Sequence, residues 1–328
     1  MTITESDFSL LTGDDPIPVV TEVDGIPMSG LLAETPTPRA VVLAVHGGAT
    51  TSVYFDCPGH PRLSLLRLAA AAGYTVLALD RPGYGSSGTH ADELADPHRR
   101  VDVMYAAAEQ HLGSRPRGAG TFLLAHSAGS ELALRMAADE RGRELLGLEL
   151  AGTGLEHQQE AYDILWGPDP HGRRRIRRDG VPGGVTDLLW YPAGLYPPEL
   201  VGGARIGSYG PRYEGNSVED WPQVTFPTLA AEVRIPVRFT VGDHERVWRN
   251  DPAALAEVAA RFTAAPRVVL NIQPNSGHNL SIGHTAAAYH LGLLAFVEET
   301  AVARAIGEFT GPSIQFNGAT AAANQEDN

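Results

Sequence analysis

Apolar residues follow two different periods along this chain. Short runs in which nearly every residue is apolar are typical of parallel strands buried on both faces of a sheet, and we predict such strands at 40–45, 74–79, 121–125, 145–150, 237–241 and 268–272. Between most of these runs, apolar residues return every three or four positions, which predicts helices at 63–72, 97–112, 128–138, 252–262 and 285–303. The alternation predicts an α/β fold with a mostly parallel, doubly wound sheet.

Three segments depart from this alternation. Extended stretches at 17–23 and 26–32 are separated by Asp24-Gly25, a dipeptide that favours a tight turn, so we predict an antiparallel hairpin on the sheet edge. Residues 152–229 interrupt the alternation and are predicted to form an inserted cap, or lid, on a core made of 1–151 and 230–310. Residues 311–328 are small and polar and are predicted to be a flexible C-terminal tail.

Composition and charge narrow the class of protein. The chain has 328 residues, of which 43% are hydrophobic and 20% charged, as in an ordinary globular domain with a large core. Its formal charge of −14 disfavours partners such as nucleic acid or an anionic membrane, which bind basic surfaces. The acidic start of the chain is unlike a secretory signal, and no stretch is apolar for long enough to span a bilayer. We therefore expect a cytoplasmic protein.

Residue types exclude several kinds of chemistry. Cys57 is the single cysteine, so an intrachain disulfide and a cysteine-based metal site are excluded, and we expect a buried or incidental thiol. The chain contains no lysine, which excludes a Schiff base and a Ser-Lys dyad. His284 and His290 lie in or near a helix without a third ligand close by. We predict no metal site and no cofactor.

The pentapeptide Ala125-His126-Ser127-Ala128-Gly129 carries the strongest chemical signal. It joins a predicted strand to a predicted helix, and its small residues two positions on either side of Ser127 allow the backbone to bend sharply. Such a bend exposes the hydroxyl as a nucleophile and turns the following amide toward a developing oxyanion. The alternative is that Ser127 only caps the helix.

The ends of the first two predicted parallel strands carry loops with little side-chain bulk. His46-Gly47-Gly48 follows the strand at 40–45, and its glycines allow a backbone amide to approach a ligand. We predict that the N–H groups of Gly48 and Ala128 form an oxyanion hole. The loop that begins at Asp80 is rich in proline and glycine, and we interpret Asp80 as a structural residue that braces its neighbours.

A serine nucleophile needs an imidazole base and a carboxylate that orients it. His278 follows the strand at 268–272 and precedes the last helix, so its loop can reach the carboxyl edge of the sheet. His126 adjoins Ser127, but neighbours on a sharp turn diverge, and we interpret His126 as a packing or loop-bracing residue. The loop after the strand at 237–241 offers two carboxylates, Asp243 and Glu245, and the residues alone leave the choice open.

The order serine, acid, histidine at successive strand ends resembles the α/β-hydrolase superfamily, in its serine-nucleophile branch with a cap insertion. The resemblance covers nearly the whole chain and is carried by segments 46–48, 80–87, 125–129, 242–245 and 277–278. It implies that Glu245 is the acid, because members of the superfamily commonly place the acid three residues after a glycine such as Gly242; Asp243 is the reserve. Glutamate in place of the commoner aspartate is a departure. A serine at the elbow, where epoxide hydrolases and haloalkane dehalogenases carry aspartate, implies acyl transfer.

The predicted cap offers candidate binding residues. Trp166 and Trp190 could form aromatic walls for a substrate, or they could be ordinary cap packing. The basic run Arg173–Arg178 could bind a carboxylate or a carrier-protein phosphate, or it could be a solvated surface. The expected partner is a small-molecule acyl substrate, free or carrier-bound.

The function predicted from the sequence is that of a serine hydrolase that forms an acyl-enzyme on an ester, thioester or amide. Three alternatives stay open: an acyltransferase or cyclase that uses the same triad, a lyase that uses the triad as a base, and a binding protein that kept the fold without the activity. The identity of the acceptor that releases the acyl group separates the first of these from hydrolysis.

Overall fold

One mixed sheet runs through the computed structural model, which describes residues 13–165, 184–219, 221–308 and 314–317. Within these residues the sheet has the strand order β1-β2-β4-β3-β5-β6-β7-β8-β9. The strands are β1 (Ile17–Val23), β2 (Ile26–Ala33), β3 (Val41–Val45), β4 (Thr75–Leu79), β5 (Thr121–His126), β6 (Leu148–Ala151), β7 (Val237–Gly242), β8 (Val268–Gln273) and β9 (Ile314–Asn317). The pairs β1–β2 and β2–β4 are antiparallel, and all pairs from β4 to β9 are parallel.

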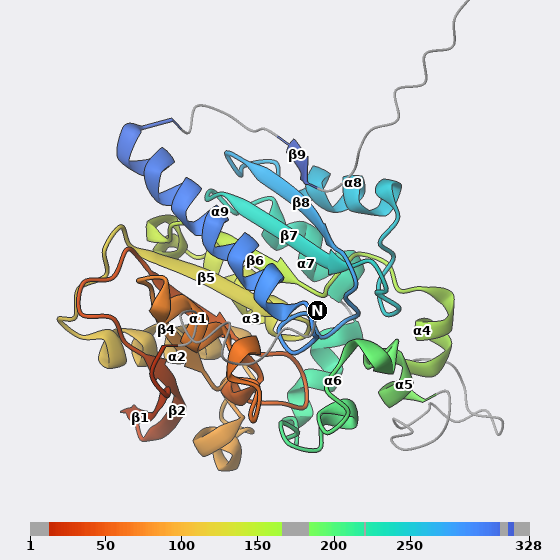
Figure 1. The fold of residues 1–328 in the computed structure, drawn as a ribbon, viewed down its shortest axis with the longest axis horizontal. Coiled ribbons are helices and arrows are strands. Elements are labelled where there is room, and N and C mark those ends of the chain that lie inside the picture. Colours follow the sequence, from red (N-terminus) through yellow and green to blue (C-terminus); the bar gives the residue numbers. More distant parts are fainter. Residues whose placement is uncertain (1–12, 166–183, 220, 309–313, 318–328) are drawn as a thin grey trace, which may run out of the picture.

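Helices cover both faces of the sheet (Figure 1). They are α1 (Leu65–Ala71), α2 (Pro97–Leu112), α3 (Gly129–Ala138), α4 (Gln159–Leu165), α5 (Val185–Leu189), α6 (Arg212–Glu219), α7 (Phe226–Ala230), α8 (Pro252–Arg261) and α9 (Ala286–Ile306). α1 and α9 pack on one face, whereas α2, α3, α7 and α8 pack on the other. The doubly wound α/β fold predicted from the sequence is confirmed.

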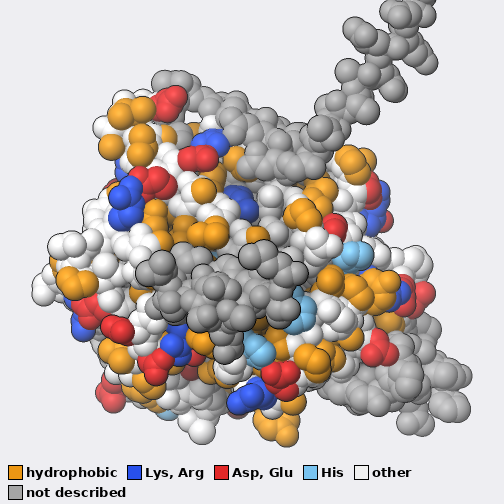
Figure 2. Space-filling view, viewed as in Figure 1, with side chains coloured by type: hydrophobic (Ala, Val, Ile, Leu, Met, Phe, Trp, Pro, Cys, Tyr) orange, Lys and Arg blue, Asp and Glu red, His pale blue; other side chains and the backbone are white. Residues whose placement is uncertain are grey.

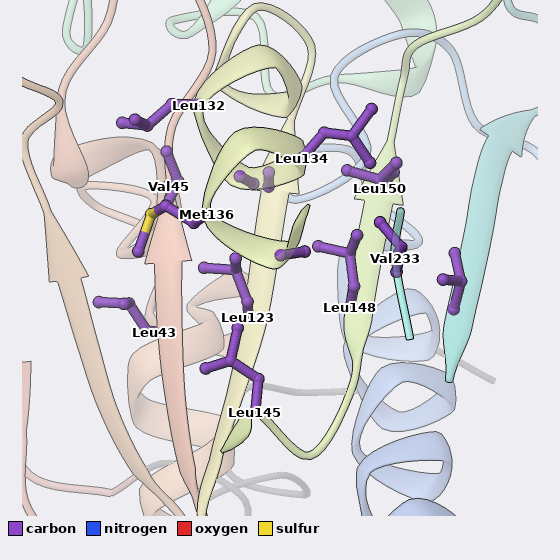
Figure 3. Close-up of a cluster of buried hydrophobic side chains, with 14 of the residues drawn as sticks. Leu43, Val45, Leu123, Leu132, Leu134, Met136, Leu145, Leu148, Leu150 and Val233 are labelled. Carbon is purple, nitrogen blue, oxygen red and sulfur yellow. The ribbon is translucent and has the colours of Figure 1, made fainter. Parts of the chain in front are cut away.

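Side chains that point alternately to the two faces of the sheet explain why a hydrophobic cluster lies on each face. In β3, the side chains of Leu43 and Val45 lie in the cluster with α3, whereas Val42 and Ala44 lie in the cluster with α1 and α9. Successive strand residues point to opposite faces, so a run that is apolar at every position is what burial on both faces requires. Figure 3 shows Leu132, Leu134 and Met136 of α3 over the strands, together with side chains from β3, β5 and β6.

The hairpin at the N-terminal edge forms at the predicted turn. Asp24 and Gly25 have φ angles of 50° and 82°, and the register pairs Val23 with Ile26. Two successive residues with positive φ make a turn whose twist matches that of the flanking strands. The predicted antiparallel hairpin is therefore confirmed.

Side-chain caps set the starts of several helices. Ser64 accepts a hydrogen bond from the Arg67 amide at the start of α1, and Asp96 accepts one from the His98 amide at the start of α2. Asp251 does the same for the Ala254 amide before α8, with Pro252 at the first helical position. These caps satisfy amides that have no partner within the helix.

Two elements differ from the prediction. Residues 314–317, placed in a flexible tail by the sequence, form β9, which pairs in parallel with β8 and extends the sheet. The sequence prediction missed β9 because four residues among small and polar neighbours carry too short a pattern to stand out. β6 begins at Leu148 and not at Leu145, because the chain turns at Gly142 and Leu145 before it enters the sheet.

The segment predicted to be a cap, residues 152–229, is called the cap segment below. Its described residues contain the short helices α4, α5 and α6, which lie together on one side of the molecule in Figure 1. It contacts the loop after β3: the Ser208 amide donates to the Ala49 carbonyl over 2.9 Å, and the Thr50 hydroxyl donates to the Ile206 carbonyl over 2.7 Å. The predicted boundary at 229 and 230 falls inside α7, which packs on α3.

The face of the molecule drawn in Figure 2 carries acidic and basic side chains close to one another. The described residues also include exposed or half-exposed ion pairs such as Arg39–Glu298 and Arg267–Glu299. Exposed pairs of this kind contribute little to stability, about 0.2–1 kcal/mol each.

Candidate active site

Ser127 lies at a sharp turn between β5 and α3. Its φ angle is 49°, a left-handed conformation that a residue with a side chain rarely adopts, and its amide donates to the Ala151 carbonyl over 2.8 Å. At Gly129 a Cβ atom would overlap the carbonyl oxygens of Val45 and His46, so glycine is required there. The strand therefore turns into the helix within two residues, and Ser127 stands at the tip with part of its surface exposed.

His278 reaches Ser127 from the loop between β8 and α9. Its Nε2 lies 2.9 Å from the Ser127 Oγ, and the imidazole is 2% exposed. The approach of this loop depends on Gly242 and Gly277, since a Cβ on Gly242 would overlap the Ser276 carbonyl and a Cβ on Gly277 would overlap Tyr191. In this arrangement the Ser127 hydroxyl donates its proton to the imidazole.

Glu245 completes the chain of hydrogen bonds. The Nδ1 of His278 donates to Glu245, with distances of 2.9 Å to Oε2 and 3.2 Å to Oε1. The carboxylate is fully buried, and Oε1 also accepts from the Val247 amide over 2.7 Å. A buried carboxylate in this position holds the imidazole in one tautomer and stabilises it when it is protonated.

Asp243, the reserve acid, lies on the same loop but has other partners. Its two oxygens accept hydrogen bonds from the amides of Asn275 and Ser276, each over 2.9 Å. Asp243 thus ties the acid loop to the loop that carries His278. The structure brings Glu245, and not Asp243, to the imidazole.

The two amides predicted for the oxyanion hole are neighbours in space. A Cβ added to Gly48 would lie 3.6 Å from the Cβ of Ala128, and a Cβ added to Gly47 would lie 3.2 Å from the Cβ of Ser127. Ala128 is the N-cap residue of α3, where the helix presents free amides and the positive end of its dipole. Both Gly48 and Ala128 are half-buried, whereas His278 and Glu245 are buried.

His126 braces the site, as predicted. Its Nε2 donates to the His278 carbonyl over 2.9 Å, and its ring stacks on Tyr54 with 4.6 Å between centroids. Burial, together with the charge of His278, lowers the pKa of His126 to about 3. His126 therefore stays neutral and holds the backbone of the residue that carries the neighbouring imidazole.

The loop that begins at Asp80 is a structural brace, also as predicted. Asp80 accepts from the Ser52 amide over 2.7 Å and from the Ser29 hydroxyl over 2.5 Å. The Ser87 hydroxyl accepts from the Gly83 amide over 2.9 Å and donates to the Tyr84 carbonyl. These bonds give the loop after β4 a fixed shape next to the loop after β3.

Of the candidate binding residues in the cap segment, only Trp190 lies among the described residues. Trp166 and the basic run 173–178 lie outside the described residues. Trp190 is buried and packs edge-on against Tyr196, with 5.2 Å between ring centroids. The Tyr196 hydroxyl accepts from the Asn279 amide, so Trp190 supports the loop next to His278. A direct contact between Trp190 and a substrate stays a prediction.

The cap segment also supports the acid loop. The Gln158 amide group donates to the carbonyls of Glu245 and Trp248, over 2.6 and 3.1 Å. His157 stacks on the Trp248 indole with 4.0 Å between centroids. Sequence reasoning missed these residues because no local pattern links residue 158 to a loop almost ninety positions later.

Arg81 and Glu214 are the other residues that sequence reasoning missed. Arg81 stands in the loop 80–87, where the motif was noted but only Asp80 was interpreted. Glu214 comes from α6 in the cap segment, and its Oε2 lies 2.5 Å from the Arg81 Nη2. The sequence carried one signal that could have pointed to Arg81: a cation close after a buried parallel strand, at the edge of the sheet where the other candidate residues lie.

The described part of the chain holds neither a cluster of metal ligands nor a helix that could span a membrane. Across residues 13–165, 184–219, 221–308 and 314–317, no cluster of three His, Cys, Asp or Glu side chains could hold a metal ion. Among those same residues, no helix combines the length and the apolar character needed to cross a bilayer. Cys57 is buried, and burial raises the pKa of its thiol to about 12.

Structural comparison finds the same fold in several hydrolases. A thermostable carboxyl esterase from Bacillus coagulans has a TM-score of 0.61 and 17% sequence identity, with 87% of this chain and 99% of the esterase covered. A thioesterase domain from the curacin biosynthetic pathway has a TM-score of 0.56 and 20% identity, with 86% of this chain and the whole of that domain covered. At these identities the likeness is one of fold.

Sequence comparison identifies the family. Protein ABHD14A of Danio rerio is 37% identical over 67 residues, which span 20% of this chain and 23% of that relative, so the match covers less than a quarter of its length. The model of the alpha/beta hydrolase family matches residues 41–289, from β3 to the first residues of α9. The chain therefore belongs to the alpha/beta hydrolase family.

Proposed function

We propose that this hydrolase acts through a serine nucleophile and an acyl-enzyme on an ester, thioester or amide of a small or medium organic substrate. The observation that carries the proposal is the chain of hydrogen bonds from the Ser127 Oγ through both ring nitrogens of His278 to Glu245. An unactivated serine is a poor nucleophile at neutral pH, and this arrangement supplies its base and the acid that orients the base.

The proposed reaction begins with Ser127. Its Oγ attacks the substrate carbonyl while His278 Nε2 takes the hydroxyl proton, and Glu245 stabilises the imidazolium that results. The carbonyl oxygen becomes an oxyanion, which accepts hydrogen bonds from the amides of Gly48 and Ala128. The leaving group then takes the proton from His278, and an acyl-Ser127 ester remains.

Water completes the turnover by the same groups in reverse roles. His278 removes a proton from the water as its oxygen attacks the acyl ester, a second oxyanion forms in the same hole, and the proton passes to Ser127 Oγ as the ester bond breaks. The family membership and the esterase and thioesterase folds support hydrolysis as the overall outcome.

Labelling with a fluorophosphonate tests the nucleophile without knowledge of the natural substrate. We expect stoichiometric modification that peptide mass spectrometry maps to Ser127, and no modification in Ser127→Ala. A folded wild-type protein that resists the probe would overturn the proposal.

A panel of substrates graded by acyl-chain length tests which acyl group the site accepts. Esters and thioesters of increasing chain length, compared by kcat/KM, report the size of the acyl site and the preferred leaving group. A second panel, with alcohols and amines added as acceptors, distinguishes hydrolysis from acyl transfer. Product formation without water incorporation would assign the protein to the transferase alternative.

A further inference from the structure

A buried ion pair joins the cap segment to the loops around Ser127. Arg81 is 4% exposed and the Glu214 side chain 9% exposed, and the Nη2 and Oε2 atoms are 2.5 Å apart. The Tyr84 hydroxyl donates to the same Oε2 over 2.7 Å. Burial is the largest single influence on the pKa of Arg81 and lowers it, but Glu214, together with Tyr84 and Tyr213, outweighs that cost. The net pKa is therefore raised, and the guanidinium stays charged.

Such a pair is a weak source of stability. Removing two charges from water costs several kcal/mol per ion, and the mutual attraction of a buried pair often does no more than offset this cost. The remaining donors of Arg81 reach the loops around Ser127. Nη2 also donates to the Gly47 carbonyl over 2.9 Å, and Nη1 approaches the Ala128 carbonyl at 3.4 Å.

The Gly47 carbonyl is one end of the peptide unit whose other end is the Gly48 amide. A peptide unit is planar and trans, so its C=O and N–H point in opposite directions and turn together. Arg81 and the Nδ1 of His46, at 2.9 and 2.8 Å, both donate to this carbonyl. Fixing the carbonyl in this direction also fixes the direction of the Gly48 N–H.

This peptide unit needs outside support because both of its residues are glycine. A Cβ on Gly47 would lie 2.8 Å from the His126 Nδ1, and a Cβ on Gly48 would lie 2.8 Å from the Glu214 Oε1. A larger residue at either position would force a neighbouring side chain to shift, and glycine leaves the backbone free to rotate. A rotated peptide would point the Gly48 N–H away from the substrate.

We propose that Arg81 is a positioning residue, which holds the Gly47–Gly48 peptide so that the Gly48 amide faces the oxyanion, and that Glu214 of the cap segment holds Arg81 in place. The cap segment then acts on the chemical step as well as on the shape of the site. The inference rests on the proposed function, since it assigns a support to the oxyanion hole of that mechanism.

The test uses two variants of the full chain and a matched control. Arg81→Lys keeps the positive charge, but a single ammonium group cannot reproduce the fork that reaches Gly47, Ala128 and Glu214 together. Glu214→Gln keeps the size of the side chain and removes its charge. Glu149→Gln makes the same change in another buried pair, Glu149–Arg238, which lies between adjacent strands.

Fluorophosphonate kinetics give the readout, because phosphonylation of serine also develops charge on an oxygen. We expect Arg81→Lys to lower the maximal labelling rate by about 10- to 100-fold, less than the about 10²- to 10³-fold for outright loss of an oxyanion-hole donor. The half-saturating probe concentration should stay within about 2-fold. Glu214→Gln should act in the same direction by a smaller factor. The double variant should match Arg81→Lys, since the two side chains act in series.

A trifluoromethyl ketone provides an independent measurement, because its adduct with serine carries an oxyanion. We expect its inhibition constant to rise in Arg81→Lys by a factor similar to the loss of labelling rate. If Arg81→Lys does not fold, Glu214→Gln carries the same test. In either variant, a folded protein with the wild-type labelling rate and inhibition constant overturns the inference.

The control separates positioning from general destabilisation. Glu149→Gln should lower the melting temperature and leave the labelling rate of the folded protein unchanged. An equal loss of labelling rate in Glu149→Gln would also overturn the inference. If the wild-type protein itself is not labelled at Ser127, the proposed function fails; if it is labelled and Arg81→Lys behaves like it, only the inference fails.

Discussion

Two buried ion pairs of similar composition lie in different parts of this molecule. Arg238 and Glu149 stand opposite each other on β7 and β6, with 3.0 Å between Nη1 and Oε2, and Tyr289 of α9 donates to the same carboxylate. Burial raises the pKa of Glu149 even though Arg238 opposes the shift. Arg81 and Glu214 are buried to a similar degree, but they join two segments more than a hundred residues apart.

The difference lies in what else each guanidinium binds. Arg238 pairs with Glu149 of the neighbouring strand and lies over the Tyr289 ring, so its contacts stay within the core. Arg81 donates to the Gly47 carbonyl next to the candidate oxyanion hole. The burial of an ion pair therefore does not reveal its role, whereas the remaining partners of its donors do.

The largest loss of activity is expected from a change at the proposed nucleophile, Ser127. Ser127→Ala removes the nucleophile, and we expect kcat/KM on a reactive ester to fall by at least about 10⁴-fold. The melting temperature should change little, because Ser127 is half-buried and its amide hydrogen bond is kept. Steady-state kinetics and thermal unfolding check both parts, and a variant that keeps most of its activity would contradict the assignment.

The two carboxylates of the acid loop should differ strongly. Glu245→Gln leaves the imidazole in the wrong tautomer, and we expect kcat to fall by about 10³- to 10⁴-fold. Asp243→Asn loses part of a loop brace, so a fall below about 10-fold is expected, with some loss of stability. The ratio of the two kcat values is the measurement. If Asp243→Asn were the more damaging change, Glu245 would not be the acid.

A change in the Glu149–Arg238 pair should lower the stability of the fold and leave catalytic activity unchanged. Glu149→Gln leaves Arg238 buried without a charged partner, and we expect the free energy of unfolding to fall by about 3 kcal/mol. Urea unfolding measures this loss, and kcat/KM at a temperature where the variant is folded should equal that of the wild type. A large change in kcat/KM would remove the contrast between the two pairs.

The smallest effect concerns His290 on α9. Burial lowers its pKa to about 3, and among the described residues neither ring nitrogen has a hydrogen-bond partner. In the unfolded chain this histidine takes up a proton below about pH 6.5, whereas in the folded protein it stays neutral. His290 therefore does not change the free energy of unfolding above about pH 6.5. Below that value it lowers the free energy of unfolding by about 1.4 kcal/mol per pH unit.

His290→Leu should remove this contribution to the slope. Urea unfolding at several pH values between neutral and about pH 5 provides the measurement. His126, whose pKa is also lowered to about 3, keeps a slope of the same sign in the variant. An unchanged slope in His290→Leu would show that folding does not lower the pKa of His290.

Most of the fold could be predicted because its signals are local. The strand β5, the turn at Ser127 and the helix α3 all follow from the spacing of apolar and small residues in a window of about twenty positions. The same holds for the hairpin at Asp24 and Gly25. β9 escaped prediction because it is held by pairing with β8, and four residues carry no period of their own.

The candidate site could be predicted in part. Ser127 and His278 stand at strand ends, where the order of elements places chemistry, but Asp243 and Glu245 are equivalent by that criterion. Only the packing of the two loops shows that Asp243 is occupied by the amides of Asn275 and Ser276. Glu214 had no local signal at all, because its partners Arg81 and Tyr84 are distant in sequence.

The sequence by itself determined the order of strands and helices, the hairpin, and the positions of the serine, the histidine and two possible acids, because these depend on spacing and residue type over short distances. Residue spacing left the choice of acid open and only the family resemblance favoured Glu245. The tertiary structure decided that Glu245 meets His278 and how the cap segment reaches Arg81. Those choices depend on the distances between loops that the sheet brings together, and a periodicity along the chain does not contain them.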